Sequence, residues 1–170
     1  LNQNLPRFVK SAKGSGALEN RIEYNEYYDD GNVQEVSKID GSHIVYLWGY
    51  EKEYPIAKIE NATFTQVTSA IATLSSSYNT LEEIQSRSDA DDDRTIKEGD
   101  LRTALNDLRE ALPNAMVTTY TFDPLIGVTS ITDPKGYTIY YEYDNANRLK
   151  MVKDADGKIV SENEYHYKSQ

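Results

Sequence analysis

Apolar and polar side chains alternate over residues 138–143, with the two-residue period of a β-strand that has two different faces. One face carries Ile139, Tyr141 and Tyr143, and the other carries Thr138, Tyr140 and Glu142. A turn is expected at 144–147, because Asn147 can take the left-handed conformation that a bulged hairpin turn requires. The pattern therefore predicts a β-hairpin whose second strand covers 148–153.

The same arrangement continues on both sides of this hairpin. Asp154-Ala155-Asp156-Gly157 is a second turn, which leads into a strand over 158–167, and Asp133-Pro134-Lys135-Gly136 is a similar turn one unit earlier. The motif that starts at Tyr141 also starts at Tyr120 and Tyr165, at spacings of 21 and 24 residues. Such a period indicates one supersecondary unit stacked on copies of itself, here a meander.

A weaker copy of the meander lies near the start of the chain. Strands are expected over 22–28, 33–39 and 43–50, with turns at 29–32 and 40–42. The third of these strands has apolar residues on both faces: Ile44, Tyr46, Trp48 and Tyr50 on one, and Val45 and Leu47 on the other. This pattern predicts a strand that is covered on both sides.

These residues resemble a known repeat. Tyr143-Asp144-x-x-Asn147-Arg148-Leu149, followed by Asp154-x-x-Gly157, is similar to the YD repeat of the Rhs family, Tyr-Asp-x-x-Gly-Arg-Leu with a glycine-centred turn after it. Residues 46–50, 54–59 and 112–120 are similar to segments of Rhs-repeat proteins of the Bacteroidetes surface type. The likeness extends over the chain except for residues 1–16 and the middle third.

Two positions depart from the repeat, and both lie at hairpin turns. Asn147 stands where the repeat prefers glycine, and Tyr28 stands where an aspartate would follow Tyr27. Asparagine is tolerated in such turns, and we expect Asp29 to take over the capping role of the missing aspartate.

The interval 65–112 differs from the rest of the chain and predicts three helices. Thr65 is expected to cap a helix towards Ser76, and Asn79-Thr80-Leu81-Glu82-Glu83 is typical of a capping box. Asp100 is expected to cap a third helix, which Pro113 ends. The apolar stripe of this helix consists of Leu101, Leu105, Leu108 and Leu112.

The predicted fold is mainly β with inserted helices, an antiparallel meander of YD-type hairpins interrupted by a helical insert. The expected segments are an N-terminal YD-like β segment (1–64), the helical insert (65–112) and a C-terminal YD-repeat β segment (113–170).

Composition limits the classes of function. The chain of 170 residues has no cysteine, which excludes disulfides and thiolate metal sites. A net charge of −10 argues against nucleic-acid binding, and no apolar run reaches the length of a membrane span. The chain begins at Leu1 without a signal peptide, so we expect it to be a piece of a longer polypeptide.

Asp89, Asp91 and Asp93 have the 1, 3, 5 spacing of a calcium loop, with Asp100 at the twelfth position. Arg94, however, replaces the glycine that the sharp turn requires, and Lys97 occupies the ninth position. We therefore interpret the segment as a solvated loop between helices, and predict no metal and no cofactor.

No catalytic arrangement can be assembled from the sequence. The tetrad at 133–136 is similar to the junction at which some Rhs-family proteins release a toxin, but a repeat follows it, so a turn is the better interpretation. His43 and His166 stand apart from any nucleophile motif. We predict that the protein is not an enzyme.

The aromatic side chains are the remaining candidates for a binding surface. Trp48, Tyr50 and Tyr54 are close in sequence, as are Tyr137 and Tyr140. Exposed rings can stack on sugar faces, whereas rings at a two-residue period can instead form cross-strand ladders. We favour the ladder for Tyr141 and Tyr143, while Tyr137 and Tyr140 face the other way.

The resemblance implies a non-catalytic structural or interaction module, a β-shell or display scaffold, of a large surface or secreted bacterial protein. The alternative is a carbohydrate-binding surface that uses exposed tyrosines. The expected partners are other repeats or domains of the same long polypeptide, glycans, and further copies through open sheet edges, with no nucleic acid and no membrane span.

Overall fold

The computed structural model describes residues 4–89 and 94–165, which form one antiparallel sheet and three helices. The strands are β1 (Phe8–Ser11), β2 (Glu19–Tyr27), β3 (Val33–Lys38), β4 (His43–Gly49), β5 (Tyr54–Glu60), β6 (Met116–Asp123), β7 (Gly127–Thr132), β8 (Thr138–Tyr143), β9 (Leu149–Asp154) and β10 (Ile159–Glu162). The helices α1 (Phe64–Ile71), α2 (Leu81–Asp89) and α3 (Arg94–Ala111) lie between β5 and β6. The predicted fold class, mainly β with a helical insert, is confirmed.

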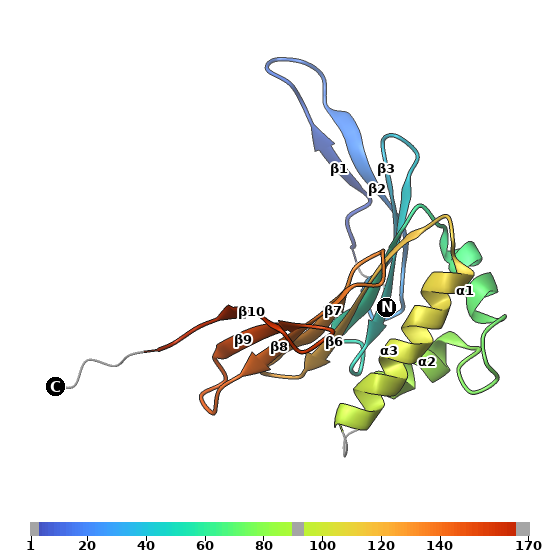
Figure 1. The fold of residues 1–170 in the computed structure, drawn as a ribbon. Coiled ribbons are helices and arrows are strands. Elements are labelled where there is room, and N and C mark those ends of the chain that lie inside the picture. The colour runs from blue at the N-terminus through green and yellow to red at the C-terminus, as the bar shows by residue number, and fades with distance from the viewer. Residues whose placement is uncertain (1–3, 90–93, 166–170) are drawn as a thin grey trace.

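The ten strands of the described residues lie in the sheet in the order in which they occur along the chain. Every neighbouring pair is antiparallel, as in the pairing of β8 with β9, where Tyr141 lies opposite Val152. The meander is therefore continuous from β1 to β5, and from β6 to β10, with β5 paired to β6 across the insert. The strand β1 was not predicted. Figure 1 shows the helices on one side of the central strands, while both ends of the sheet extend past them.

The helices cover one face of β4, and the prediction that this strand is covered on both sides was wrong. Val45 and Leu47 are fully buried beneath the insert. Tyr46 and Trp48, on the other face, keep part of their surface exposed. The insert supplies a single layer of helices, so the apolar residues on the far face of β4 pack only among neighbouring strands.

Two of the predicted helix caps differ from the structure. The N-cap of α1 is Thr63, whose Oγ1 accepts a hydrogen bond from the Gln66 N–H while Gln66 Oε1 accepts one from the Thr63 N–H. Thr65 instead lies in the first turn of α1. The predicted capping box before α2 is confirmed: Glu83 accepts from the Thr80 N–H, and Thr80 Oγ1 accepts from the Glu83 N–H.

Asp100 does not cap α3, because the helix begins at Arg94. Within a helix, the backbone N–H groups bond to carbonyls of the preceding turn, which leaves none for this carboxylate to cap. Asp100 lies 3.6 Å from the Arg87 guanidinium of α2 instead. The leucine stripe is confirmed, since Leu101, Leu105 and Leu108 are fully buried.

The core lies between this stripe and the covered face of the sheet. Its sheet side consists of Val45, Leu47, Ile56, Ala57, Ile59 and Val117, and its helix side adds Val67, Ile71, Ile84 and Ala104 to the three leucines. The helical insert and the flanking strands therefore share one core. Among the described residues, no helix is long and apolar enough to cross a membrane.

Beside this apolar core, α3 also makes polar contacts with the sheet. Arg109 donates to the carbonyl of Val117 at 3.2 Å and to Thr119 Oγ1 at 3.1 Å. Arg102 lies within 3.4 Å of Thr121 Oγ1, which is itself bonded to the hydroxyl of Ser130 at 2.6 Å. These threonine and serine side chains are almost fully buried. The arginines and the neighbouring hydroxyl groups satisfy polar atoms that would otherwise be costly to bury.

The sharp turn between β4 and β5 is held by α2. Tyr50, Glu51 and Lys52 all have left-handed backbones, with φ of 54°, 56° and 68°, which costs roughly 1 kcal/mol for each residue that is not glycine. Ser88 Oγ accepts from the Tyr50 N–H and Asp89 accepts from the Glu51 N–H, both at 2.7 Å. These two contacts offset the strain of the turn.

We predict that Leu105→Ala lowers the free energy of unfolding by about 2–5 kcal/mol, because it leaves a cavity at the centre of the shared core. Thr103→Ala, at an exposed position of the same helix, is the matched control and should change it by less than about 0.5 kcal/mol. Chemical denaturation measures both values. Equal effects of the two substitutions would contradict the placement of the stripe.

Candidate functional site

The turn between β8 and β9 is built around the carboxylate of Asp144. Its Oδ1 accepts from the N–H of Ala146 at 2.8 Å and of Arg148 at 3.0 Å. Its Oδ2 receives two further bonds from the Arg148 guanidinium, at 2.8 and 2.6 Å. Asn147 has the predicted left-handed backbone, with φ of 58°. The two ends of the Asp-x-x-Asn-Arg motif are thus joined across one turn.

The hydrogen bonds to Arg148 lower the pKa of Asp144 from 3.8 to about 2. The same pattern of backbone bonds recurs in two other turns. Asp133 Oδ1 accepts from the N–H groups of Lys135 and Tyr137, and Asp154 Oδ1 accepts from those of Asp156 and Lys158. Asp133-Pro134-Lys135-Gly136 is therefore a hairpin turn, as predicted.

In the N-terminal turns, the carboxylate that accepts the backbone hydrogen bond lies at a different position of the turn. Asp30 Oδ1 accepts from the Asn32 N–H at 2.8 Å, and Asp40 Oδ1 accepts from the Ser42 N–H at 2.9 Å. The expectation that Asp29 replaces the missing aspartate was wrong. An aspartate carboxylate can accept a hydrogen bond from the backbone N–H two residues further along the chain. Asp30, and not Asp29, is therefore in place to accept from the Asn32 N–H.

Tyr143 fixes β8 to β7 through a close approach to Gly127. The Tyr143 hydroxyl donates to the carbonyl of Val128 at 3.0 Å. A Cβ atom at Gly127 would lie 2.9 Å from Cζ of the ring and closer still to its hydroxyl oxygen. Position 127 therefore requires glycine, which has no side chain. In the sequence, this requirement is visible only as an isolated glycine.

Tyr165, from the next copy of the motif, lies on the preceding repeat. Its ring centroid is 4.2 Å from Cζ of Arg148, and its hydroxyl donates to the carbonyl of Leu149 at 3.0 Å. Arg148 thus bonds to the aspartate of its own turn and stacks on the tyrosine of the next unit. We call Tyr143, Asp144, Arg148 and Tyr165 the repeat interlock.

The predicted aromatic residues of the β4–β5 region do not form one surface. Trp48 lies on the uncovered face, where its Nε1 donates to the carbonyl of Val33 at 2.9 Å. Tyr50 and Tyr54 lie on the covered side, packed against Phe122. Burial raises the pKa of Tyr50 to about 12, and its hydroxyl accepts from the Phe122 N–H at 2.8 Å.

Tyr137 and Tyr140 are likewise separated. Tyr137 is 71% exposed at the end of the turn before β8. The Tyr140 ring lies 5.5 Å from the guanidinium carbon of Arg102 of α3, so the sheet face that carries it is partly occupied. The structure brings together only Tyr50 and Tyr54 among the five candidates, with ring centroids 6.0 Å apart.

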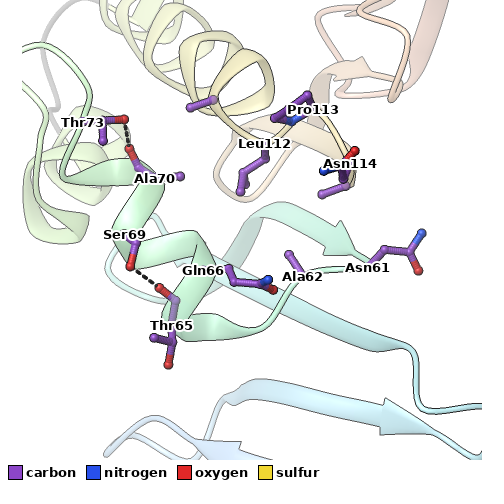
Figure 2. A pocket seen from close by; sticks show the side chains of 12 residues that line it. Asn61, Ala62, Thr65, Gln66, Ser69, Ala70, Thr73, Leu112, Pro113 and Asn114 are labelled. Atoms are coloured by element: carbon purple, nitrogen blue, oxygen red, sulfur yellow. Dashed lines mark hydrogen bonds between the residues drawn. The ribbon is translucent and has the colours of Figure 1, made fainter.

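The described residues form several surface grooves, one of them beside Asp144, Arg148 and Tyr165. Another, shown in Figure 2, has a volume of about 440 Å³ and lies between α1 and the connection from α3 to β6. Ser69 and Thr73 in its wall donate their hydroxyl groups to carbonyls of α1 itself. Asn61, Thr65, Gln66 and Asn114 supply its other polar side chains, so its lining contains no acidic, basic or histidine side chain.

A further groove is apolar and lies on the uncovered sheet face. It has a volume of about 340 Å³. Its lining residues are Ile22, Tyr24, Val33, Val36, Lys38, Ile44, Tyr46, Trp48 and Pro55. Tyr24 and Tyr46 were not among the predicted site residues, although the strand pattern placed Tyr46 on the same face as Trp48.

The candidate calcium loop is largely outside the described residues. Asp91 and Asp93 belong to the segment 90–93 that the structure does not describe. Asp89 ends α2 and accepts from the Glu51 N–H, while α3 already begins at Arg94. Within the described ranges, no group of three or more acidic or histidine side chains could hold a metal ion.

His43 contacts a carboxylate that also binds a helix. Its Nδ1 lies 2.5 Å from Glu35 Oε1, and Glu35 Oε2 accepts from the Phe64 N–H of α1 at 2.8 Å. This contact joins β3, β4 and α1, and sequence spacing alone gave no signal for it. His166 lies outside the described residues.

The comparison with protein families agrees with this geometry. A model of the RHS Repeat family matches residues 127–159, which contain β7, β8, β9 and the first residue of β10. The matched segment includes the Asp144 turn and three of the four interlock residues. It supports an Rhs/YD-repeat protein and a repeat-containing structural module. No match to the chain was found among curated proteins.

The turn carboxylate predicts a specific acid dependence. The pKa of Asp144 is lower in the folded chain than its ordinary value of 3.8, so its stabilising contribution is present above that pH. It is lost as the pH falls towards 2. Asp144→Asn should therefore destabilise the chain at neutral pH, and the difference from the unsubstituted chain should shrink in acid.

Urea unfolding as a function of pH measures this difference. In an Arg148→Gln background the acid dependence of the Asp144→Asn effect should be much weaker, because Arg148 is the main cause of the low pKa. An effect of Asp144→Asn that stays constant from neutral to acidic pH would contradict the assignment.

Gly127→Ala should destabilise the chain by about 1–3 kcal/mol, because its Cβ overlaps the Tyr143 ring. Gly136→Ala is the comparison for backbone conformation alone: Gly136 has φ of 86° but no atom near the added Cβ. Adding Tyr143→Ala should relieve much of the Gly127→Ala cost but none of the Gly136→Ala cost. Thermal unfolding of the two glycine variants, of Tyr143→Ala and of the two double variants separates these outcomes.

Proposed function

We propose that the chain is a non-catalytic structural and interaction module, a β-shell or display scaffold within a larger Rhs/YD-repeat protein. The main support for this proposal is the repeat interlock. Its tyrosine hydroxyls donate to backbone carbonyls of neighbouring strands, Asp144 holds its own turn, and Arg148 joins one unit to the next. The residues that define the motif thus hold strands together.

The proposed setting is the surface or secreted fraction of a bacterium, in a protein of the Bacteroidetes type. The RHS Repeat match at 127–159 and the similarity of residues 46–50, 54–59 and 112–120 to such proteins support this setting. The proposed partners are other repeats and domains of the same long polypeptide. Their contacts would extend the sheet at its edge strands.

Arg148→Ala tests the scaffold proposal. It removes both the two-bond contact with Asp144 and the stacking with Tyr165, so strands β8 to β10 should open more often. Amide hydrogen exchange in these strands should accelerate by about fivefold or more, while β4, β5 and α3 keep their protection. Lys150→Ala, at an exposed neighbouring position, is the control and should leave exchange unchanged.

Unchanged exchange in Arg148→Ala would show that the interlock does not join the repeats. A substrate turned over by the unsubstituted chain and not by the variant would contradict the non-catalytic part of the proposal.

A carbohydrate-binding surface is the second candidate, and one observation favours it. The apolar groove places Tyr24, Tyr46 and Trp48 on one partly exposed face, with Lys38 at the same site. Aromatic rings with polar tips suit the alternating apolar and hydroxyl faces of a sugar. Of the five aromatic residues predicted from the sequence, only Trp48 lines this groove.

A glycan array probed with the intact chain tests this candidate. Trp48→Ala should weaken binding of any glycan hit by at least about tenfold, through loss of a stacking surface. Tyr137→Ala, which removes an exposed ring elsewhere, should have no effect. An array without hits, or hits that Trp48→Ala leaves unchanged, would rule the groove out as the binding site.

A further inference from the structure

The groove of Figure 2 lies at the junction between the helical insert and the sheet, and we call it the amide groove. Residues 61–73 form one wall and residues 111–115 form the other. These walls adjoin β5 and β6, which pair with each other at the middle of the ten-stranded sheet. The amide groove therefore lies away from both outer strands, and outside the residues 127–159 that match the repeat family.

The lining of the amide groove is uncharged, although the chain has a net charge of −10. Phosphates and nucleic acids are bound by basic side chains. Peptides are bound along free strand edges, in mainly apolar or aromatic grooves, or at arginine clusters. The described residues that line this groove provide no free strand edge, no aromatic ring and no arginine. The groove therefore fits an uncharged polar ligand.

The groove also offers amide groups that the described part of the chain leaves unpaired. Within that part, the side-chain amides of Asn61 and Asn114 have no hydrogen-bond partner. Gln66 uses only its oxygen, because Oε1 accepts from the Thr63 N–H at 2.8 Å and the two N–H groups of Nε2 are left for a ligand. The capping box thus fixes the direction of the Gln66 amide before a ligand binds.

These groups suit the surface of a sugar. A side-chain amide accepts through its oxygen and donates through two N–H groups, and a hydroxyl group can both donate and accept. Figure 2 shows Gln66 extending from α1 towards Ala62, with Leu112 and Asn114 across the groove. Small apolar side chains between a few placed polar groups are typical of ligand sites, and here they can contact the C–H groups of a sugar ring.

A second groove continues past Gln66. It has a volume of about 340 Å³ and shares Asn61, Ala62 and Gln66 with the amide groove. Its lining adds polar side chains from the turn between β3 and β4 and from the cap of α1, namely Asp40, Ser42, His43 and Thr63. A ligand that lies across both grooves is a chain of several sugar units rather than a single sugar.

We propose that these adjoining grooves bind an uncharged oligosaccharide through the side-chain amides of Asn61, Gln66 and Asn114. The site differs from the apolar groove of Trp48, which lies on the uncovered face of the sheet. The inference goes beyond the scaffold function and does not depend on the repeat interlock. The lining has no aromatic ring for stacking, so the expected dissociation constant is on the order of 1 mM.

Nuclear magnetic resonance of the intact chain tests this inference. The probes are neutral tetrasaccharides of glucose, mannose, galactose and N-acetylglucosamine, with tetragalacturonate as the anionic comparison. At least one neutral probe should shift the side-chain amide signals of Gln66 and Asn114 saturably, and tetragalacturonate should not. The inference is overturned if no neutral probe shifts them at about ten times the expected dissociation constant. Shifts confined to the Trp48 indole would also overturn it.

Gln66→Glu separates binding from folding. Glutamate keeps the oxygen that completes the capping box, so the stability of the chain should not fall, but the two N–H donors are lost. Binding of the shifted probe should weaken by about fivefold or more. Asn25→Asp, at an exposed position of β2 that lines neither groove, makes the same change of net charge and should leave binding unchanged.

Asn114→Ala provides a second variant, because the Asn114 amide has no partner in the described chain whose loss would affect folding. It should also weaken binding by about fivefold. Unchanged binding in both Gln66→Glu and Asn114→Ala would overturn the assignment of the site. Neither result would alter the amide exchange of Arg148→Ala, so the scaffold function is tested separately.

Discussion

The hydrogen bonds from turn backbones to single carboxylates set the geometry on which the rest of the sheet depends. In the C-terminal meander, Asp133, Asp144 and Asp154 each accept two backbone N–H bonds and begin a hairpin of fixed length. A turn of different length would shift the pairing by one residue and move every side chain to the opposite face. The interlock then fastens the hairpin of β8 and β9 to β7 and to Tyr165 of the next unit, which helps to hold these strands in register.

That register matters because only one face of the sheet is covered. It places Val45, Leu47, Ile59 and Val117 under the leucines of α3, where they form a shared core. Further along the same face, threonine and serine replace the apolar residues, and Arg102 and Arg109 reach their hydroxyl groups. The other face keeps an apolar groove, and the two outermost strands keep open edges. These exposed features are where the proposed scaffold meets its partners.

The sequence predicted strands β2 to β4 and β8 to β10, the turns at 133–136 and 144–147 and the leucine stripe, because each depends on residues within one repeat period. It did not predict β1. Prediction from the sequence failed where contacts between residues far apart in the chain determine the structure. The cap of α1 lies at Thr63 because the chain leaves β5 there, and α3 extends past Asp100. Trp48 and Tyr50 fall on different sides of the sheet, since the left-handed turn already begins at Tyr50. Glu35, which contacts both His43 and α1, has no local pattern.

Cross-strand nuclear Overhauser effects in the intact chain test the central claim most directly, because they report register residue by residue. The structure predicts backbone contacts between Tyr141 and Val152, between Ile131 and Ile139, and between Tyr120 and Ile131. Observation of these three contacts would establish that successive turns hold neighbouring strands in this register. Contacts displaced by one residue, or pairing between strands that are not consecutive, would contradict the account.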